Sequence, residues 1–146
     1  MGTIVALGIA LGAGALMAIQ GTFNSSLGKV IGFLESIFIV QLTGFALVSI
    51  LLYLLQLGDG DLGKAGEAPW YLFLGGVIGV VIVYGVVVAI DKVGVTAATT
   101  AIIVGQVSTA AIVDHWGLFG LEQVPFTWLK FLGFILLVIG GRLLLS

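Results

Sequence analysis

Two long stretches of this sequence, residues 36–57 and 70–90, contain no aspartate, glutamate, lysine or arginine. A helix that crosses a lipid bilayer needs about 20 consecutive, mainly apolar residues, with a range of roughly 17–25. Both stretches have that length and composition. The sequence therefore predicts that each of them crosses a membrane as a helix.

Three further stretches are apolar enough to span a bilayer: residues 3–23, 95–113 and 126–145. The last contains Lys130 and Arg142 about one turn inside its two ends, where long cationic side chains can extend to the membrane surface. Alternating apolar and polar residues, which are typical of a membrane barrel, are absent from the sequence. The predicted fold is an all-α integral membrane protein, with five transmembrane helices in one domain, residues 1–146.

The composition supports a membrane protein and excludes several kinds of site. Hydrophobic residues make up 60% of the chain and charged residues 8%, against about 45–50% and roughly 25% in soluble domains. Five lysines and arginines against seven aspartates and glutamates give no basic surface for nucleic acid. The chain has no cysteine and one histidine, too few for a disulfide, a thiolate site or a multi-histidine zinc site. We expect no metal, no cofactor and no nucleic-acid partner.

The first apolar stretch has the alternative interpretation of a secretory signal peptide. It has no positive charge before the apolar run, and the run is longer than a signal peptide requires, so a retained helix is favoured. The expected connections, residues 24–35, 58–69, 91–94 and 114–125, are all short. None of them is long enough for a folded soluble domain, so any activity must lie among the helices or at their ends.

The lysines and arginines are divided almost evenly between the two ends of the predicted helices. Five spans place Lys64 and Lys130 on the side of the N-terminus, and Lys29, Lys92 and Arg142 on the other side. An excess of these residues in cytoplasmic loops normally sets the orientation. Two basic residues on one side against three on the other leave two interpretations. The chain either has one weakly preferred orientation with the C-terminus inside, or inserts in both orientations and assembles as an antiparallel homodimer.

The length of the chain favours the second interpretation. Five helices are few for enclosing a substrate path, whereas two inverted copies give ten helices with the inverted-repeat symmetry that is common in secondary transporters.

A few polar side chains lie inside the apolar stretches: Gln20, Asn24, Gln41, Tyr84 and Gln106. Polar groups in lipid tend to face the bundle or a cavity. Gln20 and Asn24 are four residues apart, which places them on one face if the first helix continues that far. Hydrogen bonds between helices and contacts to a substrate are both open interpretations for the four amides.

The fourth stretch contains Thr96, Thr99, Thr100, Ser108 and Thr109, whose hydroxyls we expect to bond back to their own helix. Asp114 and His115 follow it. Ser108, Asp114 and His115 do not form a convincing nucleophilic triad, because adjacent residues at a helix end point in different directions. The sequence therefore predicts no enzyme activity.

The carboxylates all lie at helix ends. Glu35 stands just before a predicted helix, where the helix dipole favours a negative charge. Asp91 and Asp114 follow predicted helices, where the dipole disfavours one. Asp114 and His115 are therefore candidates for a gate or a proton-linked switch, with a solvated helix end as the alternative.

Several ordered motifs resemble those of the YdcZ-like family, a five-span, half-length branch of the drug/metabolite transporter superfamily. They are QGTFNSSLG at 20–28, WYLFLGGVIG at 70–79, GQVSTAAIVDHWGLFG at 105–120, and a last helix with Gly133 and Gly140. The resemblance implies a multi-pass protein of the bacterial inner membrane. Such proteins occur as single dual-topology chains, as oppositely oriented pairs, or as fused ten-span chains, which agrees with the nearly even division of lysine and arginine in this chain.

Matched residue by residue, the resemblance places the family's polar positions on Gln20, Asn24, Gln106 and Asp114. Small multidrug members of the superfamily have a glutamate in the first span, where this chain offers Gln20 and Asn24 instead. That difference argues against proton-coupled export of cationic drugs.

The function predicted from the sequence is transport of small polar molecules by alternating access, in an antiparallel homodimer embedded in the lipid bilayer. Gln20, Asn24, Gln41 and Gln106 would line the site, with Tyr84 as an aromatic wall. Two alternatives remain. A channel would give a proton-independent flux at channel rates in liposomes. An assembly subunit would give no flux and would copurify with one partner in a fixed ratio.

Overall fold

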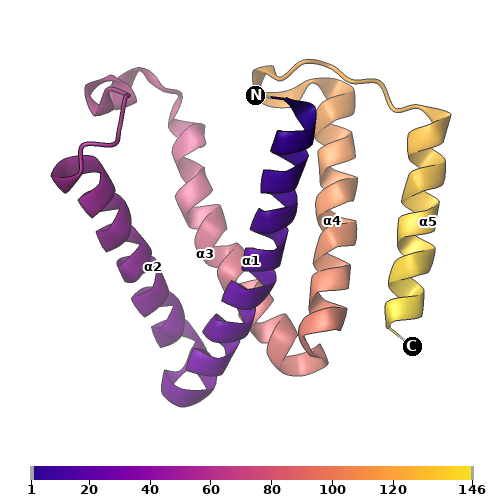
Figure 1. Cartoon of the computed structure of the whole chain (residues 1–146), viewed down its shortest axis with the longest axis horizontal. Helices are drawn as coiled ribbons and strands as arrows, with labels where there is room; N and C mark the ends of the chain where they lie inside the picture. The colour runs from indigo at the N-terminus through magenta and orange to yellow at the C-terminus, as the bar shows by residue number, and fades with distance from the viewer. Residues whose placement is uncertain (1, 146) are drawn as a thin grey trace. The chain divides into compact units, whose positions relative to one another are not determined.

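The computed structural model describes residues 2–145, and every regular element in that part of the chain is a helix. The long helices, shown in Figure 1, are α1 (Thr3–Ile31), α2 (Phe33–Ser49), α3 (Leu74–Val93), α4 (Val95–Trp116) and α5 (Trp128–Leu144). Shorter elements are a π-helix, η1 (Ile50–Leu54), and the 3-10 helices η2 (Leu62–Glu67), η3 (Trp70–Phe73) and η4 (Leu118–Gly120). Internal contacts divide the chain into two units, one ending at Asp91 and the other beginning at Lys92.

Four helices within residues 2–145 are long and apolar enough to cross a membrane: Thr3–Ile31, Phe33–Leu54, Trp70–Val93 and Val95–Trp116. They confirm an all-helical membrane fold and four of the expected spans. The fifth span is not confirmed, because α5 has only 17 residues. The helix begins at Trp128 and not at residue 126, because Thr127 caps it. The side-chain oxygen of Thr127 accepts a hydrogen bond from the backbone N–H of Lys130. At 1.5 Å per residue α5 is about 26 Å long, against a hydrocarbon core of about 30 Å.

The expected connection at residues 24–35 is wrong, because helix α1 continues to Ile31 and α2 begins at Phe33. Gly32 alone separates the two helices. Its φ of 101° is a backbone conformation that residues with a Cβ rarely adopt. A turn across residues 91–94 was also expected, but α3 includes Asp91 and Lys92, and only Gly94, with φ 83°, interrupts the helical path.

In the first unit, the helices pack at one end and separate at the other. Figure 1 shows α1 and α2 meeting at Gly32 and diverging away from it. The buried residues of this unit gather near the meeting point: Gly21, Asn24, Ser25, Gly28, Ser36, Ile37, Val87 and Ile90. A Cβ on Gly21 would lie 2.8 Å from Ile90 Cδ1 and 2.9 Å from Val86 Cγ1. A small residue at position 21 therefore lets α1 and α3 approach closely.

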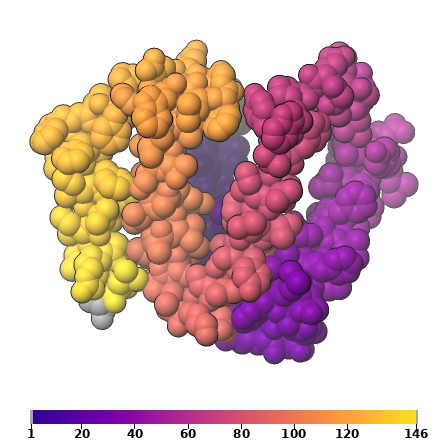
Figure 2. Space-filling view, turned by 180° about the vertical axis from the view of Figure 1, so that it is seen from behind, coloured from indigo at the N-terminus to yellow at the C-terminus, as the bar shows by residue number. Residues whose placement is uncertain are grey.

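In the second unit, α4 packs against α5, and residues 117–127 connect them across one end. Near the other end the helices approach at Gly141, where a Cβ would lie 3.1 Å from Thr100 Cγ2. Figure 2 shows an opening between α4 and α5 on the face that it presents. Large apolar side chains are exposed along all five long helices of the described chain, as expected for surfaces that meet lipid or another protein.

Candidate functional site

Gln20 and Asn24 lie on α1 and line the same open groove. Because α1 continues past Asn24, the condition for placing the two amides on one face is met. The groove has a volume of about 480 Å³ and is otherwise lined by apolar side chains: Ala13, Leu16, Met17, Ile19 and Phe23. Gln20 is exposed, whereas the side chain of Asn24 is buried. The two amides thus provide hydrogen-bond donors and acceptors in an otherwise apolar concave surface, the usual arrangement of a small-molecule site.

Gln106 and Asp114 line a second groove, on α4 in the other unit. Its volume is about 560 Å³, and its other lining residues are Gly105, Thr109, Ala110, Val113 and Leu121. Residues 106 and 114 are eight positions apart on one helix, which places them about two turns apart on one face. Thr109 joins them there, although the sequence assigned it only an intrahelical bond. Amide, hydroxyl and carboxylate groups therefore share this groove.

His115 lies in the last turn of α4 but lines a different pocket from Asp114. That pocket, of about 350 Å³, lies against α5 and is lined by Ser108, Ala111, Ile112, His115, Trp116, Phe126 and Phe134. The imidazole Nδ1 accepts a hydrogen bond from the backbone N–H of Phe126 at 3.2 Å. The backbone carbonyl of His115 accepts one from Gln123 Nε2 at 2.8 Å.

Gln41 and Tyr84 line none of these three surfaces. Gln41 is exposed on α2, and Tyr84 is 47% exposed on α3. Within the first unit, neither residue lines the groove that contains Gln20 and Asn24. Their assignment to the site remains a prediction.

Intrahelical bonds account for two of the five hydroxyls of the fourth span. The side chains of Thr100 and Ser108 donate to the carbonyls four residues earlier, Thr96 at 2.8 Å and Val104 at 2.6 Å. Ser108 therefore donates to its own helix, and His115 Nδ1 is bonded to Phe126. Among the described residues no hydrogen bond joins Ser108 to His115, although both line the same pocket.

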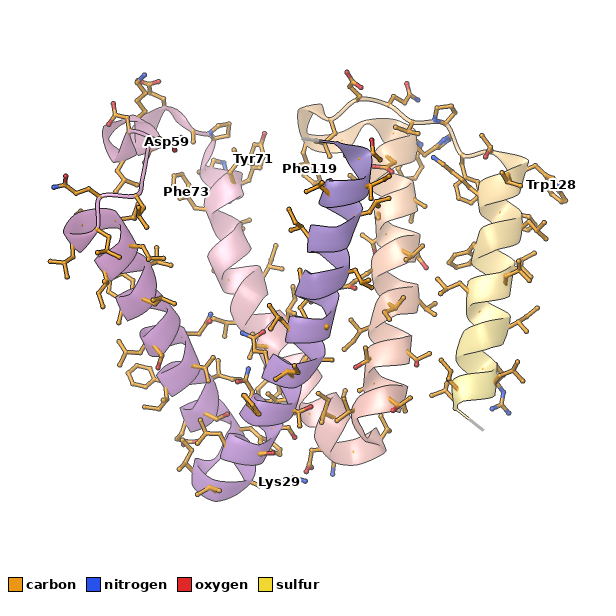
Figure 3. All side chains as sticks on the ribbon, in the orientation of Figure 1. Lys29, Asp59, Tyr71, Phe73, Phe119 and Trp128 are labelled. Carbon is orange, nitrogen blue, oxygen red and sulfur yellow. The ribbon has the colours of Figure 1, made fainter. Side chains whose placement is uncertain are left out.

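An ion pair at the packed end of the first unit was not anticipated from the sequence. Lys29 Nζ lies 3.3 Å from Asp91 Oδ1, and their side chains are 61% and 23% exposed. Figure 3 shows Lys29 at this end, where α1 and α2 meet. Lys29 in the last turn of α1 is favoured by the helix dipole, and it also offsets the unfavourable position of Asp91 near the end of α3. The only signal in the sequence was the presence of opposite charges at two helix ends.

Aromatic side chains lie at helix ends. Trp70 and Tyr71 open the third span, with ring centroids 6.4 Å apart, and Trp128 is the first residue of α5. Figure 3 shows Tyr71 and Phe73 at the start of the α3 segment and Trp128 at the start of α5. Tryptophan and tyrosine are enriched where helices meet the membrane surface. Within residues 2–145, no group of three or more histidines and carboxylates is placed to hold a metal ion.

Comparison with known protein families gives one match, which covers residues 5–143. The matching family is described as "Putative inner membrane exporter, YdcZ". Searches of curated proteins and of solved structures give no match. The family description and the four apolar helices of membrane length place the protein in the inner membrane. The match covers nearly the whole sequence, and the chain therefore belongs to the YdcZ family of membrane transport proteins.

Proposed function

We propose that the protein transports small polar molecules across the inner membrane by alternating access, as an antiparallel homodimer. The observation that carries this proposal is that polar side chains share open grooves on largely apolar helices. Gln20 and Asn24 share one groove, and Gln106 shares another with Asp114. Such grooves offer hydrogen bonds to a polar solute at the depth of the membrane, where polar side chains are costly unless they have a partner or a role.

In this proposal α5 is the fifth span. Its 17 residues lie at the lower limit for crossing a bilayer, and shorter helices are accommodated by local thinning and by flanking side chains. Lys130 and Arg142 lie one turn inside its ends, where they extend toward water. Trp128 at its first position is suited to the membrane surface. Five spans place the two ends of the chain on opposite sides.

The distribution of charge supports an antiparallel arrangement of two copies. With five spans, the end that contains residues 58–69 and 117–127 has five carboxylates and two lysines, a net charge of −3. The opposite end has three basic residues and two carboxylates, a net charge of +1. Parallel copies place like-charged ends side by side, whereas antiparallel copies place the −3 end of each beside the +1 end of the other. Lysine and arginine alone, two against three, impose little preference on insertion.

The dimer would complete the site. Gln20, Asn24 and Gln106 form its polar surface, and Gln41 and Tyr84 reach it from the other copy or after a conformational change. Asp114 and His115 lie near its mouth and control access. Two inverted copies that exchange conformations open one central site to each side of the membrane in turn.

Labelling of single cysteines in the region 58–69 tests the topology. Gly60→Cys suits this purpose, because the chain has no native cysteine and no atom of the described residues lies within 4 Å of a Cβ at Gly60. An impermeant maleimide should label part of the protein from each side of the membrane. Labelling from one side only would refute dual topology. Two added lysines in the same region should restrict labelling to one side and reduce transport.

Asn24→Leu and Gln20→Leu test the site. The purified parent is first screened by thermal shift against metabolites and organic cations, and the stabilising compounds are then used in liposome flux assays. Both variants should remain folded and lose binding, because leucine removes the hydrogen-bonding groups. Met17→Leu is the matched control, since it changes a side chain of the same groove and keeps its apolar character. Unchanged binding in both amide variants would show that the amides only join helices.

A further inference from the structure

Residues 117–127, here called the strap, connect α4 to α5. Besides the backbone N–H of Gly117, which caps α4, three hydrogen bonds hold the strap to the end of α4. The backbone N–H of Val124 donates to the carbonyl of Asp114 at 2.8 Å. Gln123 Nε2 donates to the carbonyl of His115 at 2.8 Å, and the N–H of Phe126 donates to His115 Nδ1 at 3.2 Å. The first two bonds end on backbone carbonyls, which do not titrate. Only the third ends on a side chain that can take up a proton, the imidazole of His115.

The bond to Phe126 requires a neutral imidazole. Nδ1 accepts a hydrogen bond only while it has a lone pair, so the single ring proton must be on Nε2. When the ring takes a second proton, Nδ1 becomes a donor that faces the N–H of Phe126. Two donors cannot form a hydrogen bond, and the contact between them becomes repulsive.

Phe126 also lines an apolar pocket of about 350 Å³ between the end of α4 and α5. Its lining includes Ile112, Trp116 and Phe134 as well as Phe126 and His115. Loss of the bond to His115 releases the backbone of Phe126 directly before Thr127, the residue that caps α5. A change in the charge of His115 therefore acts on the pocket and on the start of α5 together.

We propose that His115 and Phe126 form a pH-sensitive latch, which is closed when the imidazole is neutral and open when it is protonated. Opening detaches the C-terminal part of the strap and moves Phe126 in the wall of the pocket, while Val124 and Gln123 keep the rest of the strap attached to α4. The latch itself does not depend on transport activity. Its role as a proton-dependent gate rests on the proposed function.

The charged groups near the latch do not hold the protonated ring in the closed position. Asp114 precedes His115 and lines the other groove of α4, and Glu122 lies in the strap. Lys130, on α5, donates to the carbonyl of Pro125 at 3.3 Å and adds a positive charge next to Phe126. Within residues 2–145, no ion pair or hydrogen bond joins any of these three groups to the imidazole.

Nitrogen NMR of protein labelled with ¹⁵N-histidine tests the latch directly, because the chain contains one histidine and the imidazole signals need no assignment. At a pH above the midpoint of the titration, the spectrum should show Nε2 protonated and Nδ1 unprotonated. On acidification, Nδ1 should become protonated. In a uniformly ¹⁵N-labelled sample, the assigned backbone amide signal of Phe126 should shift with the same midpoint. A proton on Nδ1 at alkaline pH, or a Phe126 amide that ignores the titration, would overturn the proposal.

Two variants fix the latch in its two states. Asparagine at this position offers a non-titrating acceptor close to the place of Nδ1, so His115→Asn should keep the Phe126 amide protected from hydrogen exchange at every pH. His115→Phe removes the acceptor and should leave that amide unprotected at every pH. Exchange rates are corrected for the intrinsic effect of pH. Gln123→Ala is the matched control: it removes a non-titrating bond of the strap and should leave the pH dependence at Phe126 unchanged.

Transport assays then separate the latch from the proposed function. If flux is measurable, His115→Asn should flatten its pH profile. If no flux is found with any substrate, the proposed function fails, while the latch is still decided by the NMR titration. Protection of Phe126 that depends on pH in His115→Asn as it does in the parent would refute the latch regardless of flux.

Discussion

Gly21→Ala tests the close approach of α1 and α3 on which the packed end of the first unit depends. The added methyl group would lie 2.8 Å from Ile90 Cδ1 and 2.9 Å from Val86 Cγ1, well inside van der Waals contact. Ile90 can move its terminal methyl group, but the β-branched Val86 is stiff about χ1 in a helix. Ile90 is also 8% exposed and its neighbour Val87 is fully buried, so little free space is available to receive the displaced atoms.

Two opposing terms set the change in the free energy of unfolding that Gly21→Ala causes. Overpacking of a well-packed contact costs about 1–3 kcal/mol, and exchange of glycine for alanine inside a helix gains about 0.5–1 kcal/mol. Gly14→Ala contains only the second term, because Gly14 lies on the same helix and a Cβ there would meet no atom of another element within 4 Å. The difference between the two variants therefore isolates the first term. We expect Gly21→Ala to be less stable than Gly14→Ala by about 1–3 kcal/mol. A difference of 1.4 kcal/mol is a tenfold change in an equilibrium constant.

Equilibrium unfolding in mixed micelles with increasing SDS, followed by circular dichroism, measures this difference. Gly8→Ala, at another open position of α1, provides a second reference. Equal stability of the variants at Gly21 and Gly14 would show that α1 and α3 do not approach at Gly21 in the folded protein. Greater stability of Gly21→Ala than of the parent would refute the argument in the same way.

Three smaller effects are expected elsewhere. Thr127→Ala removes the hydrogen bond to the N–H of Lys130 and should cost about 1 kcal/mol, visible as faster hydrogen exchange in the first turn of α5. Gly117→Ala forces a Cβ into a left-handed conformation, φ 58°, and should lower the free energy of unfolding by roughly 1–2 kcal/mol; no loss would contradict that conformation. Lys29→Gln removes the ion pair with Asp91. Because the side chain of Lys29 is exposed, this change should lower the free energy of unfolding by less than about 1 kcal/mol. A larger loss, measured by SDS unfolding, would show that the pair is buried in the assembled protein.

The helical membrane fold could be predicted because the bilayer imposes a length and a composition that are visible in each apolar stretch. The errors arose at the helix ends. Residues 24–35 contain asparagine, serine, lysine and glutamate and were expected to form a connection, yet helix α1 continues through Asn24 and Ser25. Both side chains are buried against neighbouring elements instead of facing water. Tertiary packing thus overrides the local preference of these residues for loops.

Only part of the grouping of polar side chains could be predicted from the sequence. A spacing of four residues predicted that Gln20 and Asn24 share a face of α1, and both line one groove there. The sequence analysis assigned Gln106 and Asp114 to different roles, whereas the two residues share a groove along α4. The ion pair between Lys29 and Asp91 and the bond between Phe126 and His115 join separate elements. No helical periodicity contains that information, because it depends on how the elements pack.

The one-residue link at Gly32 determines how the first two helices can enter a membrane. A single residue extends at most about 3.6 Å, so in the folded protein the end of α1 and the start of α2 lie on the same side of the bilayer. The two helices therefore form one hairpin, and neither can reverse its direction across the membrane without the other.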